Sequence, residues 1–174
     1  MFSISYSAAY DPFHTVFRFA SLLLNSQDNS QRFGVLQISD FYLCFPWLMS
    51  DLTAPRSVSG FQKKRNELLR RYKASSYDIT PTASTLFERM EPIQLAALSA
   101  MLSKKLVVET DLPGVVQIQL DMFSQRLLES VQRYVKENNE LILFLSEELP
   151  KIPLAGKAGL KDRSGLKEYR YDYV

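Results

Sequence analysis

The chain has 174 residues, of which 46% are hydrophobic and 23% charged, and its formal net charge is +2. A chain of this length forms one domain, or one domain with an appendage, and buries about two thirds of the surface that its unfolded form exposes. So small a net charge excludes a nucleic-acid function that rests on overall charge alone, and a single cysteine excludes an internal disulfide.

Residues 11–25, DPFHTVFRFASLLLN, predict the first helix, which Asp11 can cap with Pro12 at the first helical position. Its apolar residues form two faces: Phe13, Val16, Phe17, Ala20 and Leu24 lie on one, and Phe19, Leu22 and Leu23 on the other. A helix with two apolar faces is covered on two sides, and in a small domain the second cover can be another protein. The residues expected to bind a partner are Phe13, Phe17, Phe19 and Leu22, above all on the Phe19 and Leu22 side.

A polar loop, SQDNSQ, leads to LQISDFYLCFPWLM at residues 36–49, which predicts a second buried helix. Asp40 and Pro46 are unlike a membrane span, and no apolar run reaches the roughly 20 residues that a bilayer needs. Pro46 should end or kink the helix, and Cys44 suits the role of a small buried hydrophobe in a reducing compartment. Since no basic leader opens the chain either, we expect a cytoplasmic protein.

Residues 60–74 predict an amphipathic helix whose inner side carries Phe61, Leu68, Leu69 and Tyr72. Its outer surface carries one acid, Glu67, and six cations: Lys63, Lys64, Arg65, Arg70, Arg71 and Lys73. This surface is either a solvated helix face or a docking patch for phosphates or for an acidic partner. If the protein binds nucleic acid, these six residues are the candidates for contact with its backbone.

Two further helices are predicted from TPTASTLFERM (80–90) and EPIQLAALSAMLSKKL (91–106), with Pro92 at the start of the second. A strand, LVVE, a turn, TDLPG, and a second strand, VVQIQL, follow them. Two helices joined by a tight turn and followed by a strand hairpin have the order of a winged-helix domain. The predicted fold class is therefore mainly α with a small β-hairpin wing, a winged helix with an N-terminal helix and a long C-terminal helix.

The second helix of this unit is poorly suited to reading DNA. Sequence-reading helices present Arg, Lys, Asn, Gln or Ser to base edges, whereas only Gln94 and Ser99 offer polar groups along the middle of this helix. Glu109 and Asp111 would bring negative charge on the wing toward phosphates. The helix is built to be packed upon, so the basic helix of residues 60–74 is the better place for contact with a DNA backbone.

Residues 124–149 predict one long amphipathic helix, whose apolar stripe is covered either by the domain's own core, which is favoured, or by a partner helix. Asn138 falls on the stripe, where a polar residue often fixes register or partner. Residues 1–150 are expected to form a single domain, and residues 151–174 an extended tail or docking arm. Tyr169 and Tyr171 favour contact between this arm and a partner.

The sequence does not predict catalysis. His14, the one histidine, lies on an apolar helix, and the sequence contains neither a His and Cys cluster nor a phosphate-binding glycine loop. We therefore expect no catalytic residue, metal, cofactor, small-molecule ligand or membrane contact.

Three stretches, YDPFHTVFRFASLLL, LQISDFYLCFPWLM and FERMEPIQLAALSAMLSKKLV, resemble the middle component of ABC-three-component systems. These bacterial operons encode a small protein between an effector and an SMC-like ATPase, and the Lamassu-type defence systems are among them. The resemblance covers roughly residues 10–110. The residues that match the family's motifs are Tyr10, Asp11, Pro12 and His14 at the N-terminus, Asp40, Phe41 and Pro46 in a DF...FP element, and Met90, Pro92 and Ile93 in an M.PIQ element.

The resemblance implies a non-catalytic adaptor that holds an effector nuclease on an SMC-like coiled-coil ATPase until foreign DNA, from phage or plasmid, is sensed. ATP hydrolysis and DNA cleavage would then belong to the partners. One alternative is a free-standing winged-helix transcription regulator that dimerises through residues 124–149. In a third possibility, the cations of residues 60–74 contact the DNA backbone within the complex.

Overall fold

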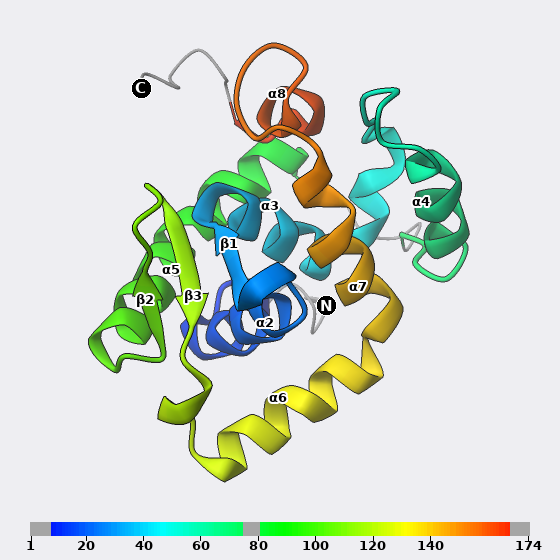
Figure 1. The fold of residues 1–174 in the computed structure, drawn as a ribbon. Helices are drawn as coiled ribbons and strands as arrows, with labels where there is room; N and C mark the ends of the chain where they lie inside the picture. The colour runs from blue at the N-terminus through cyan, green and yellow to red at the C-terminus, as the bar shows by residue number, and fades with distance from the viewer. Residues whose placement is uncertain (1–7, 75–80, 168–174) are drawn as a thin grey trace.

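The computed structural model describes residues 8–74 and 81–167 of the chain. The helices are α2 (Pro12–Leu24), α3 (Phe33–Cys44), α4 (Phe61–Leu69), α5 (Ala83–Ser103), α6 (Gln125–Glu137), α7 (Asn139–Glu147) and α8 (Leu160–Ser164). The strands are β1 (Ser30–Arg32), β2 (Val107–Glu109) and β3 (Val115–Ile118), and short 3-10 helices are η1 (Gln27–Asn29), η2 (Pro46–Asp51), η3 (Leu120–Met122) and η4 (Leu149–Lys151). The fold is therefore mainly helical with a small antiparallel sheet (Figure 1).

The helix α2 lies at the centre of the fold, between α5 and α6 in Figure 1, and contacts α3 and α7 as well. It begins as predicted, because Asp11 accepts a hydrogen bond from the Phe13 N–H at 2.8 Å and Pro12 follows the cap. The helix α3 also ends as predicted, at Cys44, and Pro46 opens η2. Every residue of α3 from Val35 to Leu43 is buried, under α2, α5 and α7.

The predicted hairpin is present, and the sheet has one strand more than the sequence predicts. In the hairpin, Val107 lies opposite Ile118. The third strand, β1, occupies part of the predicted polar loop and pairs antiparallel with β3, which gives the order β1-β3-β2. Ser30, Gln31 and Arg32 lack the apolar alternation of a strand, so their pairing is set by tertiary contacts rather than by local preference.

The two helices predicted over residues 80–106 are a single helix, α5, with Pro92 in its interior. Residues 83–103 contain no glycine and are rich in Ala and Leu, so the segment does not favour a turn. Pro92 leaves the carbonyl of Glu88 without its helical partner, but both residues are exposed and water can bind that carbonyl. The prediction of a helix-turn-helix within this segment is therefore wrong.

The prediction of a single helix over residues 124–149 is also wrong, because Asn138 separates two helices, α6 and α7. Asn138 has φ −119° and ψ 24°, and its side-chain amide donates to the Tyr134 carbonyl at 3.0 Å, which ends α6. Asn138 thus turns the chain within its own fold. Leu141, Ile142 and Leu145 are buried in the chain's own core, which confirms the cover that the sequence favoured for this stripe.

Residues 151–167 do not form the extended tail that was predicted for residues 151–174. Ile152, Leu160 and Leu166 are 1%, 0% and 3% exposed and belong to the same core as the helices. Gly34 of α3 allows this segment to approach, since a Cβ there would lie 2.8 Å from Leu154 Cδ2. The sequence did not predict this packing, because the apolar residues are isolated within a Pro- and Gly-rich segment, a composition that is typical of a tail. Tyr169 and Tyr171 lie outside the described residues.

Candidate interaction surfaces

The apolar residues of α2 that were predicted to bind a partner fall into two groups. Phe13 is 81% exposed and Phe17 is partly buried, whereas Phe19 and Leu22 are 0% and 1% exposed. Because α3, α5, α6 and α7 surround α2, the chain itself covers the side on which a partner was expected. The prediction is therefore wrong for Phe19 and Leu22, while Phe13 remains open at the surface.

A buried ion pair explains why α3 carries an acid. Arg18 of α2 donates from Nε to Asp40 Oδ1 at 2.5 Å, and both side chains are almost completely buried. Arg18 also donates to the Thr15 hydroxyl at 2.8 Å and to the Ala8 carbonyl at 2.9 Å. Burial disfavours the charged guanidinium, but the negative charge of Asp40 and the hydrogen bond outweigh it and raise the pKa of Arg18.

Gln94 of α5 completes this network from a third helix. Its side-chain amide donates to Asp40 Oδ2 at 2.9 Å and to the Gln37 carbonyl at 3.1 Å, and the residue is 0% exposed. The prediction that Gln94 presents a polar group at the surface of its helix is therefore wrong. The network holds α2, α3 and α5 in one arrangement.

Sequence patterns missed the roles of Arg18 and Gln94. A signal is nevertheless present, since Arg18 is the single cation in one apolar helix and Asp40 the single acid in the other. A lone charge between buried positions requires a partner, so the two helices could have been paired through these residues. Gln94 offers no comparable signal, because a glutamine in a helix is usually exposed.

The basic helix α4 docks on the acidic helix α7 of the same chain. Lys64 donates to Glu148 Oε1 at 2.5 Å, just beyond the end of α7, and Arg71 forms an ion pair with Glu140 at 2.6 Å. Arg65 is buried and donates to the Leu52 carbonyl. Three of the six cations are thus engaged within the fold, which leaves Lys63, Arg70 and Lys73 as exposed cations with no ion pair to a described residue.

Glu148 is the buried acceptor of this contact. Its side chain is 4% exposed, and Lys151 also donates to Oε1, at 3.0 Å. Burial favours the neutral carboxyl, but the hydrogen bonds and charges of Lys64 and Lys151 outweigh it and lower the pKa of Glu148. The hydrogen bond to Glu148 in turn raises the pKa of Lys64.

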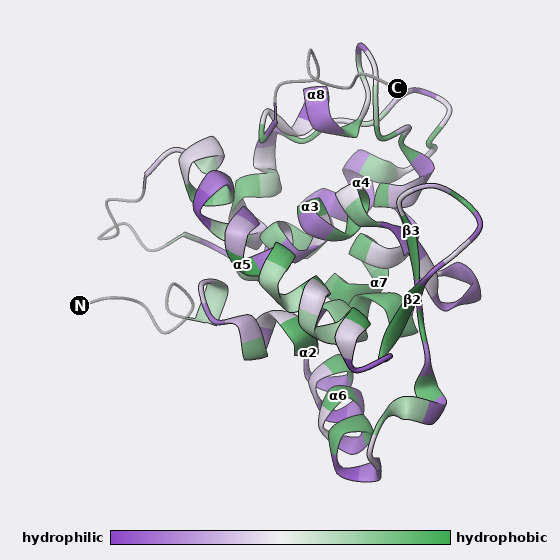
Figure 2. Ribbon diagram, turned by 90° about the vertical axis from the view of Figure 1, so that its left-hand side faces the viewer, coloured by the Kyte–Doolittle hydropathy of each residue, from purple (hydrophilic) through white to green (hydrophobic). Residues whose placement is uncertain are grey.

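The exposed side of α5 carries no charge between Glu91 and Lys104. We call the exposed residues from Pro92 to Ala100 the α5 face: Pro92, Leu95, Ala96, Ser99 and Ala100. Leu95 is 53% exposed, and this half of α5 is mostly green and white in Figure 2. On the hairpin that follows α5, Leu112 is 66% exposed. Together these residues form uncharged surface that is open to other proteins.

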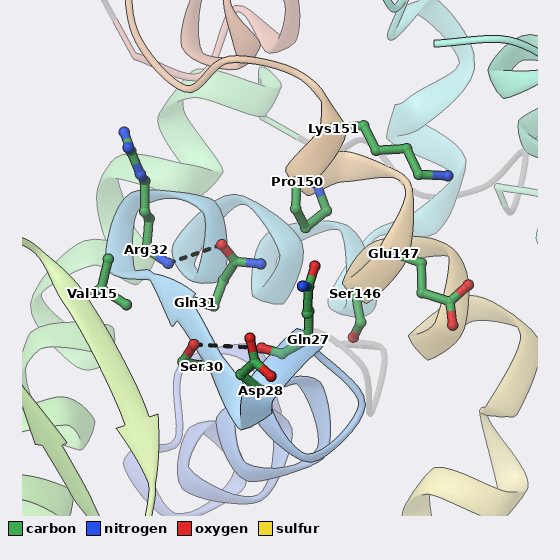
Figure 3. Close-up of a pocket in the computed structure, with 10 residues that line it drawn as sticks. All are labelled: Gln27, Asp28, Ser30, Gln31, Arg32, Val115, Ser146, Glu147, Pro150 and Lys151. Carbon is green, nitrogen blue, oxygen red and sulfur yellow. Dashed lines mark hydrogen bonds between the residues drawn. The ribbon is translucent and has the colours of Figure 1, made fainter. Parts of the chain in front are cut away.

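A hollow of about 550 Å³ lies beside β1 (Figure 3). Its lining comes from residues 27, 28 and 30–32 and Val115 on one side, and from the end of α7, Pro150 and Lys151 on the other. Figure 3 shows the Gln31 side chain reaching into the hollow, where its Oε1 accepts from the Arg32 N–H at 2.9 Å. The lining has two amides, two hydroxyls and two charges of each sign, which can donate or accept hydrogen bonds.

A family model matches residues 4–172, and its description is ABC-three component (ABC-3C) system Middle Component 5. The chain belongs to this family. The match confirms the resemblance and extends it from residues 10–110 to nearly the whole chain. Membership in the Middle Component 5 family supports an accessory subunit of a defence system and implies partner subunits. No curated protein and no solved structure matches the chain.

The motif residues that carry the resemblance to the family serve mostly the fold of this chain. Asp11 caps α2, Asp40 holds Arg18 and Gln94, and Met90 is 0% exposed in the core. Pro92 differs, since it lies on the exposed α5 face. Core positions are thus explained by packing, whereas Pro12 and His14 at the start of α2 and Pro92 on the α5 face are motif residues that other chains can reach.

Side chains of the kinds that bind metals or take part in catalysis are few in the described part of this Middle Component 5 chain. Within the described ranges, no three His, Cys, Asp or Glu side chains gather as metal ligands would. His14 has a 61% exposed side chain and lies 4.0 Å from Asp11 at the start of α2, a loose contact. Across residues 8–74 and 81–167, none of the helices combines the length and the apolar character needed to cross a bilayer.

Proposed function

We propose that this Middle Component 5 protein is a non-catalytic adaptor that holds an effector nuclease on an SMC-like coiled-coil ATPase, in a complex that senses foreign DNA. The α5 face is the observation that carries the proposal. The exposed residues of α5 are uncharged from Pro92 to Ser103. A helix that reads DNA presents hydrogen-bonding side chains to base edges, whereas Gln94 is buried here. A flat face of small and apolar residues instead suits the apolar side of a coiled-coil helix.

We also infer that the core is a winged helix whose helix pair differs from the one that the sequence predicts. The order α2, β1, α3, α5, β2, β3, with the sheet order β1-β3-β2, is compatible with the winged-helix plan if α3 and α5 are its helix pair. The segment with η2 and α4 is then an insertion between them. In this plan α5 corresponds to the helix that DNA-binding relatives of the fold place in the major groove, and its uncharged face points to a protein partner.

Contact with DNA inside the complex is assigned to the exposed cations of α4 and the residues just after it. Lys63, Arg70 and Lys73 are exposed, whereas Lys64 and Arg71 are committed to α7. Three cations support backbone contact that adds to the binding of a larger assembly, and they are too few to form an independent DNA-binding surface.

Co-purification of the protein with the products of the adjacent genes tests the adaptor. We expect a stable complex with a long coiled-coil ATPase. The variant Leu95→Asp should weaken it by about tenfold or more, because it places a charge in the apolar contact. The matched control Gln132→Asp, on the exposed side of α6, should leave the complex intact. Tight operator binding by the isolated protein, without such a complex, would overturn the adaptor in favour of a free-standing transcription regulator.

A further inference from the structure

The hollow beside β1 continues into a second one and forms a groove. The second hollow, of about 470 Å³, shares Gln31, Arg32, Pro150 and Lys151 with the first and extends to Ala155. One wall of the groove is the η1–β1 segment, and the other is the end of α7, η4 and the residues after η4 up to Ala155. An elongated groove along an edge strand suits an extended polypeptide.

Among the described strands β1 pairs only with β3, so it lies at an edge of the sheet. The Phe33 N–H donates to the Gly114 carbonyl at 2.8 Å, and Gln31 lies opposite Val116. Since bonded and non-bonded pairs alternate in antiparallel strands, Ser30 and Arg32 direct their backbone groups away from β3. This edge of β1 therefore faces the groove that the two hollows form.

The outward N–H groups of β1 donate to nearby acceptors of the same chain. The Ser30 N–H donates to the Gln27 carbonyl, and the Arg32 N–H donates to Oε1 of the neighbouring Gln31. The Gln31 side chain thus takes the position that the carbonyl of an added strand would take. A change of its rotamer frees the Arg32 N–H for such a strand, at little cost for a side chain at the surface.

The opposite wall and the charges define the occupant further. Pro150 and Pro153 have no N–H, so this wall offers ring surface and cannot itself pair with β1 as a regular strand. Arg32 is exposed and makes no ion pair with a described residue, and the residues that line the second hollow include two cations and no acid. Asp28 and Glu147 line only the first hollow. Lys151 is already paired with Glu148, so the positive charge that an occupant can use in the second hollow is that of Arg32, whereas the first hollow is lined by charges of both signs.

We infer that this groove binds an extended segment of a partner subunit, which adds to the edge of β1 and places an acidic side chain against Arg32. The existence of partner subunits rests on the proposed function, whereas the chemistry of the segment comes from the groove. Main-chain hydrogen bonds to β1 provide affinity, and the charge at Arg32 sets the register of the segment.

Short overlapping peptides that cover the products of the two adjacent genes, labelled with fluorescein, test the inference by fluorescence anisotropy. We expect a peptide with an Asp or Glu to bind the wild-type protein and to bind Arg32→Glu about tenfold more weakly or worse. The same peptide with Lys in place of that acid should regain affinity for Arg32→Glu. The control Arg126→Glu removes an exposed arginine of α6 and should bind like wild type.

Failure of this inference and failure of the adaptor are distinguishable. If no peptide binds, or if peptides bind Arg32→Glu as tightly as wild type, the inference that the groove binds a partner segment is wrong, even where the full complex assembles. If no complex with the ATPase assembles, the adaptor is overturned even where a peptide binds the groove. Arg32 is exposed, so a thermal unfolding midpoint equal to that of wild type shows that the variant is folded.

Discussion

Arg18 Nε donates a hydrogen bond to Asp40 Oδ1 at 2.5 Å, at a place where the two residues are only 4% and 0% exposed. Because Gln94 donates to the other carboxylate oxygen at 2.9 Å, the carboxylate joins three helices. Charges this deep are tolerated only when their partners are all in place. The α5 face depends on this arrangement, since the network fixes how α5 lies on α2 and α3.

Substitution of Arg18→Met should destabilise the protein by about 3–5 kcal/mol, because it leaves the Asp40 carboxylate buried without a cation. Urea unfolding followed by circular dichroism measures this loss as a lower midpoint at unchanged slope. The exposed arginine Arg126 provides a matched control, and Arg126→Met should change stability by no more than about 0.5 kcal/mol.

The double variant Arg18→Met with Asp40→Leu separates loss of the pair from loss of one partner. Apolar side chains of similar volume remove the uncompensated charge, so the double variant should recover much of the stability that Arg18→Met loses. Gln94 then loses one acceptor but keeps the Gln37 carbonyl. A double variant less stable than Arg18→Met would show that the ion pair itself, and not the stranded carboxylate, determines the effect.

The contact between α4 and α7 should depend on pH through Glu148. Its pKa is lowered in the folded protein, because the hydrogen bonds and charges of Lys64 and Lys151 outweigh burial. A lowered pKa gives stability that is complete above the unfolded pKa, about 4.3, and is lost as pH falls through the folded pKa. The stability difference between wild type and Glu148→Gln should therefore be largest near neutral pH and shrink in acid. Urea midpoints measured at a series of pH values check this.

Two comparisons sharpen the pH measurement. Exposed Glu147 is adjacent to Glu148, and Glu147→Gln should show no comparable change of the difference with pH. At alkaline pH the stability of the folded protein depends on Lys64, whose pKa is raised by Glu148. The stabilisation that Lys64 provides is complete below its unfolded pKa, about 10.4, and is lost as the pH rises through its folded pKa. If the difference between wild type and Glu148→Gln were constant from neutral pH to strong acid, the ion pair would not stabilise the carboxylate.

Cys44 should react slowly in the native protein. It lies at the end of α3, and burial raises the pKa of its thiol above the ordinary value. Because the thiolate is the reactive species, labelling with a thiol reagent near pH 8 should be much slower than in urea, where the thiol is free. The single cysteine makes the absorbance change easy to assign. Equally fast labelling in both conditions would contradict the raised pKa of the thiol.

The elements that the sequence predicts correctly are those with strong local signals. Asp11 and Pro12 begin α2, Pro46 ends α3, and turn residues join the apolar strands β2 and β3. Each of these features depends on neighbours in the chain. The errors have the opposite origin: β1 forms because β3 lies beside it, and Asn138 breaks an apolar pattern that fits one helix. Tertiary contacts override local preference at these places.

The surfaces were harder to predict than the fold. The basic residues of α4 form a clear pattern, but nothing local shows that Glu140 and Glu148 neutralise two of them. Likewise Phe19 and Leu22 have the pattern of a second exposed face, and only the central place of α2 shows that the chain covers them. The absence of charge from Pro92 to Ser103 can be read from the sequence without long-range information, whereas the contact of this helix with a partner stays a prediction.

The cations of α4 should separate into those that hold the fold and those that contact DNA. The triple variant Lys63→Glu, Arg70→Glu and Lys73→Glu changes exposed residues only. It should weaken salt-sensitive DNA binding by the assembled complex while leaving assembly and the unfolding midpoint unchanged, because backbone contacts depend on exposed positive charge. The matched variant Lys64→Glu with Arg71→Glu places like charges beside Glu148 and Glu140 and should lower the midpoint. DNA binding by the triple variant that equals wild type, at every salt concentration, would remove α4 from the DNA interface and leave it as a clamp on α7.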